Sequence, residues 1–436
     1  MKTNVTKMFL LFCLGVALAA VSGCGGSDDD SAENGGDTDT DTDTDADGDA
    51  DGDTDTDTDT DTDGDTDGDT DGDTDGDTDG DTDGDTDGDT DTDTDADADH
   101  EGGDPLPEAD DGQWTWVPFN GAKCANGSKA GMSVRYADSN GLLIFLEGGG
   151  ACMNFTTCLA CPSSTAAAMR NPGSGGIFAA ENANNPTQGF NAVYVPYCTG
   201  DCHAGNNPDG NVAGAGKQQF MGGANYRKFL ASIAATFTDV DTVVLAGYSA
   251  GALGAAWNYH DTVAAFGDGV TVTGLFDGAA VFRDDYLGPC LQEKVFNLWG
   301  MGEYLPADAE GCDPTDEGSL FNIYGYVAKK FPNASVGLVS SLQDATMRTF
   351  YGYGENDCNV TMPNYGGPKY ANALRDLRDY FDEVEMKGGT YYYGGSQHGV
   401  IILSSFFNHS VGDTKLVDWI DGLMAGQTTV HVDPDL

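Results

Sequence analysis

Residues 112–436 are predicted to form an α/β fold with a mostly parallel central sheet flanked by helices. Six short apolar runs are the expected core strands, at 142–146, 192–197, 242–246, 270–276, 336–340 and 390–393, after a strand-rich entry at 114–136. Continuous runs of this kind are typical of parallel strands, which are buried on both faces. Apolar residues three and four positions apart at 226–237, 370–384 and 416–424 predict helices. Strands that alternate with helices indicate a layered α/β architecture.

The charge of the chain is concentrated in one segment. The sequence has 73 acidic and 19 basic residues, a formal net charge of −54. Residues 25–111 hold 41 of the acids and no lysine or arginine, and every odd position from Asp37 to Asp99 is aspartate. Because this segment has almost no apolar side chains to bury, residues 24–111 are expected to be a disordered acidic linker. The excess of acidic over basic residues argues against nucleic-acid binding, which needs a positively charged surface.

The first 23 residues have the pattern of a signal peptide. A short basic start precedes an apolar run at 8–21, which is too short to span a bilayer comfortably. Small residues directly before Cys24 resemble the lipobox of bacterial lipoproteins, which implies cleavage before Cys24 and a lipid on its thiol. An ordinary secretory signal is the alternative. Both hypotheses place the mature protein outside the cytoplasm, at the cell surface, in the periplasm or secreted, with a membrane contact only through the lipid.

The acidic tract is expected to act as a tether. Its charges lie within a Debye length of one another, so they repel and extend the chain. The alternating Asp, Thr and Gly residues also look like calcium-loop repeats, but the bidentate glutamate that closes an EF-hand loop is missing. Weak association of Ca²⁺ at many positions is therefore the expected binding property of this tract.

Nine cysteines follow Cys24, and in an exported domain they predict up to four disulfides and one free thiol. They are Cys124, Cys152, Cys158, Cys161, Cys198, Cys202, Cys290, Cys312 and Cys358. The close set at 152–161 also suits zinc, but no histidine lies nearby at ligand spacing, so no metal site is expected. Cys198 and Cys202 bracket a tight turn and could pair with each other.

The segment Gly247–Gly251 has the Gly-x-Ser-x-Gly pattern of a nucleophile elbow. It follows an apolar strand and precedes a helical stretch, which is the context that the motif requires. The turn exposes the hydroxyl of Ser249 at the carboxyl edge of the sheet. Serine needs a base to accept its proton, and His398 is the candidate because it lies in a glycine-rich loop directly after a strand.

The acid that orients the base is left open between two aspartates. Asp277 ends the strand after the elbow helix, and Asp344 lies just past the strand at 336–340. Backbone N–H donors for an oxyanion are expected in the glycine-rich loop 147–152 and at Ala250, the residue after the nucleophile. A phosphate-binding loop is the competing hypothesis, but the Lys and Ser/Thr of a P-loop are missing.

Several motifs together resemble the pectin acetylesterase/Notum family of carboxylesterases. These are LLIFLEGGGAC at 142–152 with Asn154 and Cys158, YVPYCTGDCHAG at 194–205, GYSAG at 247–251 and the loop at 395–399. The resemblance implies an α/β-hydrolase fold, no cofactor and a triad of Ser249, His398 and Asp344. It implies oxyanion donors at Gly149, Gly150 and Ala250.

Two positions depart from the family pattern. Gly150 stands where animal and plant members often have tryptophan, so the loop looks like the bacterial branch and no lipid-specific pocket is assumed. Cys202 is not a usual family position. Asp201 and His203 are candidates for lining the site or for a structural role.

The predicted function is an extracytoplasmic serine carboxylesterase that removes acyl groups, acetyl first among them, from a polysaccharide or another small ester. One alternative is a surface lipoprotein with a non-catalytic hydrolase-like domain and a calcium-associating tract. Another is hydrolysis of a polyester or a peptide by the same triad.

Overall fold

A computed structural model describes residues 100–159, 161, 171–360, 363–426 and 430–434 of the protein. The chain divides into two units, Met1–Asp95 and Ala96–Leu436, and the second contains all the described residues. The predicted signal peptide, the lipid attachment at Cys24 and the calcium-associating tract lie outside these residues. Within the described part, no helix is both long enough and apolar enough to cross a membrane.

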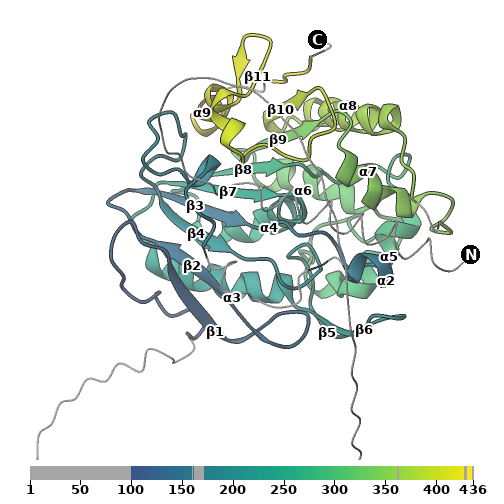
Figure 1. Ribbon diagram of the computed structural model, residues 1–436, viewed down its shortest axis with the longest axis horizontal. Coiled ribbons are helices and arrows are strands. Elements are labelled where there is room, and N and C mark those ends of the chain that lie inside the picture. Colours follow the sequence, from purple (N-terminus) through teal and green to yellow (C-terminus); the bar gives the residue numbers. More distant parts are fainter. Residues whose placement is uncertain (1–99, 160, 162–170, 361–362, 427–429, 435–436) are drawn as a thin grey trace, which may run out of the picture. The chain divides into compact units, whose positions relative to one another are not determined.

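Eight strands form the central sheet in the order β1-β2-β4-β3-β7-β8-β9-β10 (Figure 1). They are β1 (Thr115–Lys123), β2 (Lys129–Arg135), β3 (Gly141–Leu146), β4 (Asn191–Val195), β7 (Thr242–Tyr248), β8 (Thr271–Asp277), β9 (Ser335–Ser341) and β10 (Lys387–Tyr393). The six strands from β4 to β10 run parallel, and β1 and β2 form an antiparallel edge. The predicted sheet is therefore confirmed, and each expected strand run coincides with a strand.

Helices cover both faces of the sheet. They are α2 (Phe155–Cys158), α3 (Gly222–Thr236), α4 (Ala250–Phe266), α5 (Pro289–Trp299), α6 (Ile323–Lys330), α7 (Ala345–Tyr351), α8 (Gly367–Glu383) and α9 (Leu416–Met424). Short 3₁₀ turns lie at Gly176–Phe178, Met301–Glu303, Leu320–Asn322, Gly352–Gly354 and Ser404–Asn408. Two small hairpins lie outside the central sheet. They pair β5 (Asn207–Val212) with β6 (Gly216–Phe220), and β11 (Ser410–Val411) with β12 (Thr414–Lys415).

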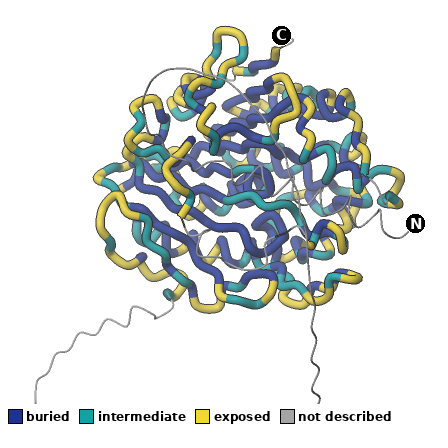
Figure 2. Tube along the Cα trace, in the orientation of Figure 1, coloured by how far each residue is buried: buried dark blue, intermediate teal, exposed yellow. Residues whose placement is uncertain are grey.

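Alternate residues of each strand enter two separate cores. Leu142 and Ile144 of β3 pack in the cluster that contains the apolar faces of α3, α4, α6 and α8. Leu143 and Phe145 pack in the opposite cluster, with α9 and the segment 400–406. Both faces of the parallel strands are thus buried, as their continuous apolar sequences predict, and the strands are dark blue in Figure 2.

The folded unit begins before the boundary predicted at residue 112. His100 donates its backbone N–H to Pro118, and Leu106 is buried in the core. The β5–β6 hairpin and α5, α6 and α7 were not among the expected elements. The sequence of β5, Asn-Pro-Asp-Gly-Asn-Val, consists mainly of turn-forming residues, so it carries no strand pattern.

Three disulfides occur among the described cysteines: Cys124–Cys198, Cys152–Cys158 and Cys290–Cys358. Cys161, Cys202 and Cys312 are free thiols. The expected pairing of Cys198 with Cys202 is wrong, because Cys198 at the end of β4 is joined to Cys124 after β1. The 152–161 set forms a disulfide, which removes two of the three thiolates that a zinc site there would use.

The Cys124–Cys198 bridge connects segments 74 residues apart in the chain. We expect Cys124→Ser combined with Cys198→Ser to lower the free energy of unfolding by about 2–5 kcal/mol, because the bridge restricts the unfolded chain. Urea unfolding measures this loss. Cys312→Ala, at a buried free thiol, is the control and should cost less; an equal loss would show that the bridge adds nothing beyond side-chain packing.

Candidate active site

Four neighbouring strands each place one polar residue at the same edge of the sheet. Ser249 follows β7, Asp277 ends β8, Asp344 lies three residues after β9, and His398 is in the loop after β10. Because β7, β8, β9 and β10 are adjacent and parallel, their carboxyl ends lie side by side. Residues that are up to 149 positions apart in the chain are brought together by this arrangement.

Ser249 has the strained backbone of a nucleophile elbow. Its φ is 57° and its ψ is −122°, a conformation that costs a non-glycine residue free energy. The two flanking glycines are required by close packing. A Cβ atom at Gly247 would collide with the carbonyl oxygen of Gly251, and one at Gly251 would collide with that of Leu146. The motif therefore has the local structure that its sequence predicts.

His398 and Asp344 form a hydrogen-bonded pair. Nδ1 of His398 lies 2.8 Å from Oδ2 of Asp344, whose side chain is fully buried. The other carboxylate oxygen accepts the backbone N–H groups of Thr346 and Met347, both at 2.9 Å, and caps α7. Backbone hydrogen bonds from the segment 342–345 to the segment 393–396 hold the two loops together. Asp344 thus occupies Nδ1 of His398, and the other ring nitrogen, Nε2, has no hydrogen-bond partner among the described residues.

Asp277, the other candidate acid, does not bond to His398. Its Oδ2 accepts the backbone N–H groups of Val400 and Ile401 at 2.6 and 2.8 Å. The structure thus brings Asp344, rather than Asp277, to the imidazole. Strand order could not separate the two aspartates, because both follow strands that end at this edge.

The three predicted oxyanion donors lie in the loop after β3, which contains Gly149 and Gly150, and at the first residue of α4, Ala250. Within the described residues, no backbone carbonyl accepts the N–H of Gly149, Gly150 or Ala250. Gly150 and Ala250 line the same cavity as Ser249, whereas Gly149 does not. Gly150 has a φ of +86°, which favours glycine at this position.

Tyr197 and His203 form hydrogen bonds to the glycine-rich loop 147–152. The backbone N–H of Tyr197 donates to the carboxylate of Glu147 at 2.8 Å, and its hydroxyl donates to the carbonyl of Gly150 at 3.0 Å. Nε2 of His203 lies 2.8 Å from the carbonyl oxygen of Glu147. Asp201 in turn accepts the N–H of His203 at 3.2 Å. Asp201 and His203 therefore support the loop and are not among the residues that line the cavity.

Burial controls the protonation of these supporting groups. It raises the pKa of Glu147 to about 7 and that of Asp201 to about 6. It lowers the pKa of His203 to about 4, so this imidazole is neutral at pH 7 and donates Nε2–H to the Glu147 carbonyl.

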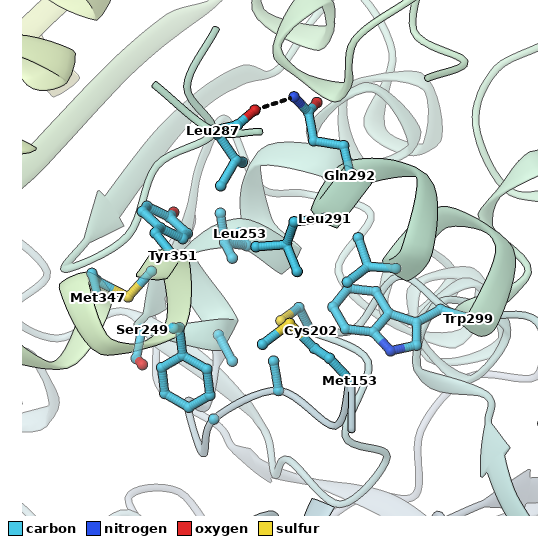
Figure 3. A pocket seen from close by; sticks show the side chains of 15 residues that line it. Met153, Cys202, Ser249, Leu253, Leu287, Leu291, Gln292, Trp299, Met347 and Tyr351 are labelled. Carbon is cyan, nitrogen blue, oxygen red and sulfur yellow. Dashed lines mark hydrogen bonds between the residues drawn. The ribbon is translucent and has the colours of Figure 1, made fainter. Parts of the chain in front are cut away.

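An apolar cavity of about 60 Å³ opens beside Ser249 (Figure 3). Its walls come from α5, from α7, from the start of α4 and from the loops that lead to these helices or follow β3 and β4; they are Gly150, Ala151, Met153, Cys202, Ser249, Ala250, Leu253, Leu287, Leu291, Gln292, Val295, Trp299, Met347, Phe350 and Tyr351. The α5 wall was missed from the sequence. Leu291, Val295 and Trp299 are four residues apart and would have indicated a helical face, but nothing in the sequence links that face to Ser249.

Glu147 provides a test of this buried network. A carboxyl whose pKa is raised by folding stabilises the fold below its unfolded pKa, and this stability is lost as the pH rises from about 4.5 to 7. Glu147→Gln keeps the acceptor for Tyr197 and cannot ionise. Its free energy of unfolding relative to the parent should rise by about 3 kcal/mol across that interval. Urea unfolding at several pH values measures the difference. Glu293→Gln, at an exposed position of α5, should show no such trend; an equal trend in both variants would contradict the assignment.

Comparisons with known proteins find one family and two kinds of similar protein. Residues 113–296 match the family model "PAE: Pectinacetylesterase". A segment of the chain is 31% identical over 171 residues to palmitoleoyl-protein carboxylesterase notum2 of Xenopus laevis. This match covers 35% of this chain and 34% of that protein. The chain thus spans about a third of the length of that relative.

Solved structures of the Wnt deacylase Notum from Drosophila share the fold. Crystal form II superposes with a TM-score of 0.52 at 22% identity, covering 71% of this chain and 93% of Notum. Crystal form I gives 0.50 at 20% identity, covering 72% and 93%. The family match over residues 113–296 and the curated relative confirm the resemblance to the pectinacetylesterase/Notum family seen in the motifs, and the solved structures show a Notum-like α/β-hydrolase fold.

Proposed function

We propose that the domain is a serine carboxylesterase that removes a short acyl group through an acyl-enzyme. The observation that carries the proposal is the juxtaposition of Ser249, at a strained elbow beside an apolar cavity, with the edge that holds the His398–Asp344 pair. The names of the relatives, a carboxylesterase and a deacylase, support the same reaction class.

In the proposed reaction, Oγ of Ser249 attacks the ester carbonyl while Nε2 of His398 accepts its proton. Asp344 accepts Nδ1–H, which keeps the lone pair of the imidazole on Nε2, where a base is needed. The negative oxygen of the tetrahedral intermediate is stabilised by the N–H groups of the 149–150 loop and of Ala250. His398 then returns the proton to the leaving alcohol, and water releases the acid by the same steps in reverse.

The cavity favours a small acyl group. About 60 Å³ has room for roughly four to six water-sized groups, which suits a short acyl group such as acetyl or butyryl. We therefore propose acetyl esters as substrates, with an acetylated polysaccharide as one source. The 32 acidic and 17 basic residues of 112–436 make a strongly anionic polymer less suitable than a neutral one.

The location outside the cytoplasm is also a proposal. The three disulfides support an oxidising compartment, since such bonds are rare in the cytosol. The lipid at Cys24 would attach the acidic linker, and through it the enzyme, to a membrane.

The proposed triad predicts a graded loss of activity. With nitrophenyl acetate, Ser249→Ala should lower kcat at least about 10³-fold, and Asp344→Asn should lower it about 10⁴-fold, because the wrong tautomer of His398 is favoured. Full activity of Ser249→Ala would exclude the proposal. A parent enzyme that hydrolyses no ester in a panel of nitrophenyl esters and acetylated glycans would favour a non-catalytic domain.

The α5 wall predicts the acyl-chain preference. The parent should hydrolyse nitrophenyl acetate and butyrate and be poor with the octanoate. Leu291→Ala removes part of the wall and should raise kcat/KM for octanoate relative to acetate by at least about tenfold, which is the lower end of the contribution of one methylene group in an apolar pocket. Leu298→Ala lies on the same helix outside the lining and is the control. If both variants keep the parental preference, the wall does not select the acyl group.

A further inference from the structure

Asp277 is a buried carboxylate that the triad does not use. It ends β8, between β7, which carries Ser249, and β9, which leads to Asp344. Its side chain is completely inaccessible to solvent. Burying an acid is costly, so its contacts need an explanation other than packing.

Asp277 bonds to both loops that carry the proposed nucleophile and base. Its backbone carbonyl accepts the N–H of Ser249 at 2.8 Å. Its Oδ2 accepts the N–H groups of Val400 and Ile401, two and three residues after His398. One residue therefore joins two segments that are separated in the sheet by β8 and β9.

Tyr248, the partner of Asp277 in the β7–β8 register, holds the same loop from its other end. Its hydroxyl donates to the carbonyl of His398 at 3.0 Å. Between the two anchors lies Gly399, whose φ is +66° and whose Cβ, if present, would collide with the Tyr248 ring and lie 3.0 Å from Oδ2 of Asp277. The loop after His398 is thus pressed against the end of β7 with no space for a side chain.

We propose that Asp277 is a positioning residue, which fixes the loop after His398 against the nucleophile turn and so sets the separation of Ser249 and His398. This inference rests on the proposed esterase function. The two residues must meet within hydrogen-bond reach during the reaction, and a displacement of about 1 Å can lower the rate about 100-fold.

The charged groups around Asp277 are consistent with this role. His398 and Asp344 face it from the loops after β10 and β9, and Tyr248 and Tyr393 face it from β7 and β10. Burial raises the pKa of Asp277 to about 6, against the effect of its two N–H donors. At pH 7 to 8 the group is mainly a carboxylate, which accepts these N–H bonds more strongly than a neutral carbonyl would.

The test compares two substitutions at this position. Asp277→Asn keeps an oxygen that can accept both N–H groups, whereas Asp277→Ala removes it. With nitrophenyl acetate at pH 8, kcat should stay within about tenfold of the parent for Asn and fall about 100-fold for Ala, with KM little changed in both. Hydrogen exchange of the Val400 and Ile401 amides should accelerate in Asp277→Ala and remain slow in Asp277→Asn.

Leu275→Ala, in the same strand and equally buried, is the matched control for loss of stability. It should lower Tm at least as much as Asp277→Ala and change kcat by no more than about threefold. The proposal is overturned if Leu275→Ala loses as much activity as Asp277→Ala, or if Asp277→Asn is as impaired as Asp344→Asn, which would make Asp277 the acid that orients His398.

If the esterase proposal itself fails, the outcome of these experiments differs from the one that overturns the role of Asp277. A parent that hydrolyses no ester would remove the catalytic part of the argument, while the exchange of the Val400 and Ile401 amides would still show whether Asp277 holds the loop. If Asp277→Ala proves too unstable to purify, Asp277→Ser, which is too short to reach the loop, takes its place with the same expected loss of kcat and of amide protection.

Discussion

The backbone register of the parallel ladder from β7 to β10 is the constraint on which the candidate site depends. It pairs Tyr248 with Asp277, Asp277 with Val339, and Ser341 with Tyr393, so that β7 and β8 end at one level and β9 and β10 end two residues further along. Because these hydrogen bonds lie inside two apolar cores, the register cannot shift without exposing both. Each loop that leaves this edge therefore starts from a fixed point, and short side chains are enough to make the contacts between loops.

Buried carboxyl groups fix the positions of the loops that leave this sheet. Glu147, Asp201 and Asp277 are acids with raised pKa values, and each accepts backbone N–H groups of a loop at the site or of the segment behind it. At neutral pH their burial costs stability, and in return the loops are held by charge-assisted hydrogen bonds. Burial of these acids thus lowers stability, while their hydrogen bonds position the loops of the proposed reaction centre.

One wall of the cavity comes from a segment of the chain that carries none of the proposed triad residues. Its outer wall is α5, which is linked through Cys290–Cys358 to the loop after α7 and through the Trp299 indole to the carbonyl of Cys152. The acyl group would thus be selected by a helix that lies between β8 and β9 in the chain, while the reaction would occur at the sheet edge.

The sequence alone predicted the strands of the central sheet, the elbow at Ser249 and the α/β class, because each of these is encoded by local periodicity or by a short motif. It also made His398 the candidate base, from its place in a glycine-rich loop after a strand. It left Asp277 and Asp344 unresolved, since both satisfy the same local rule, and only the resemblance to a family favoured Asp344. The tertiary structure decided which carboxylate reaches the imidazole, which cysteine pairs with Cys198 and which helix lines the cavity. All three depend on contacts between residues more than 40 positions apart, and the local sequence carries no information about such distances.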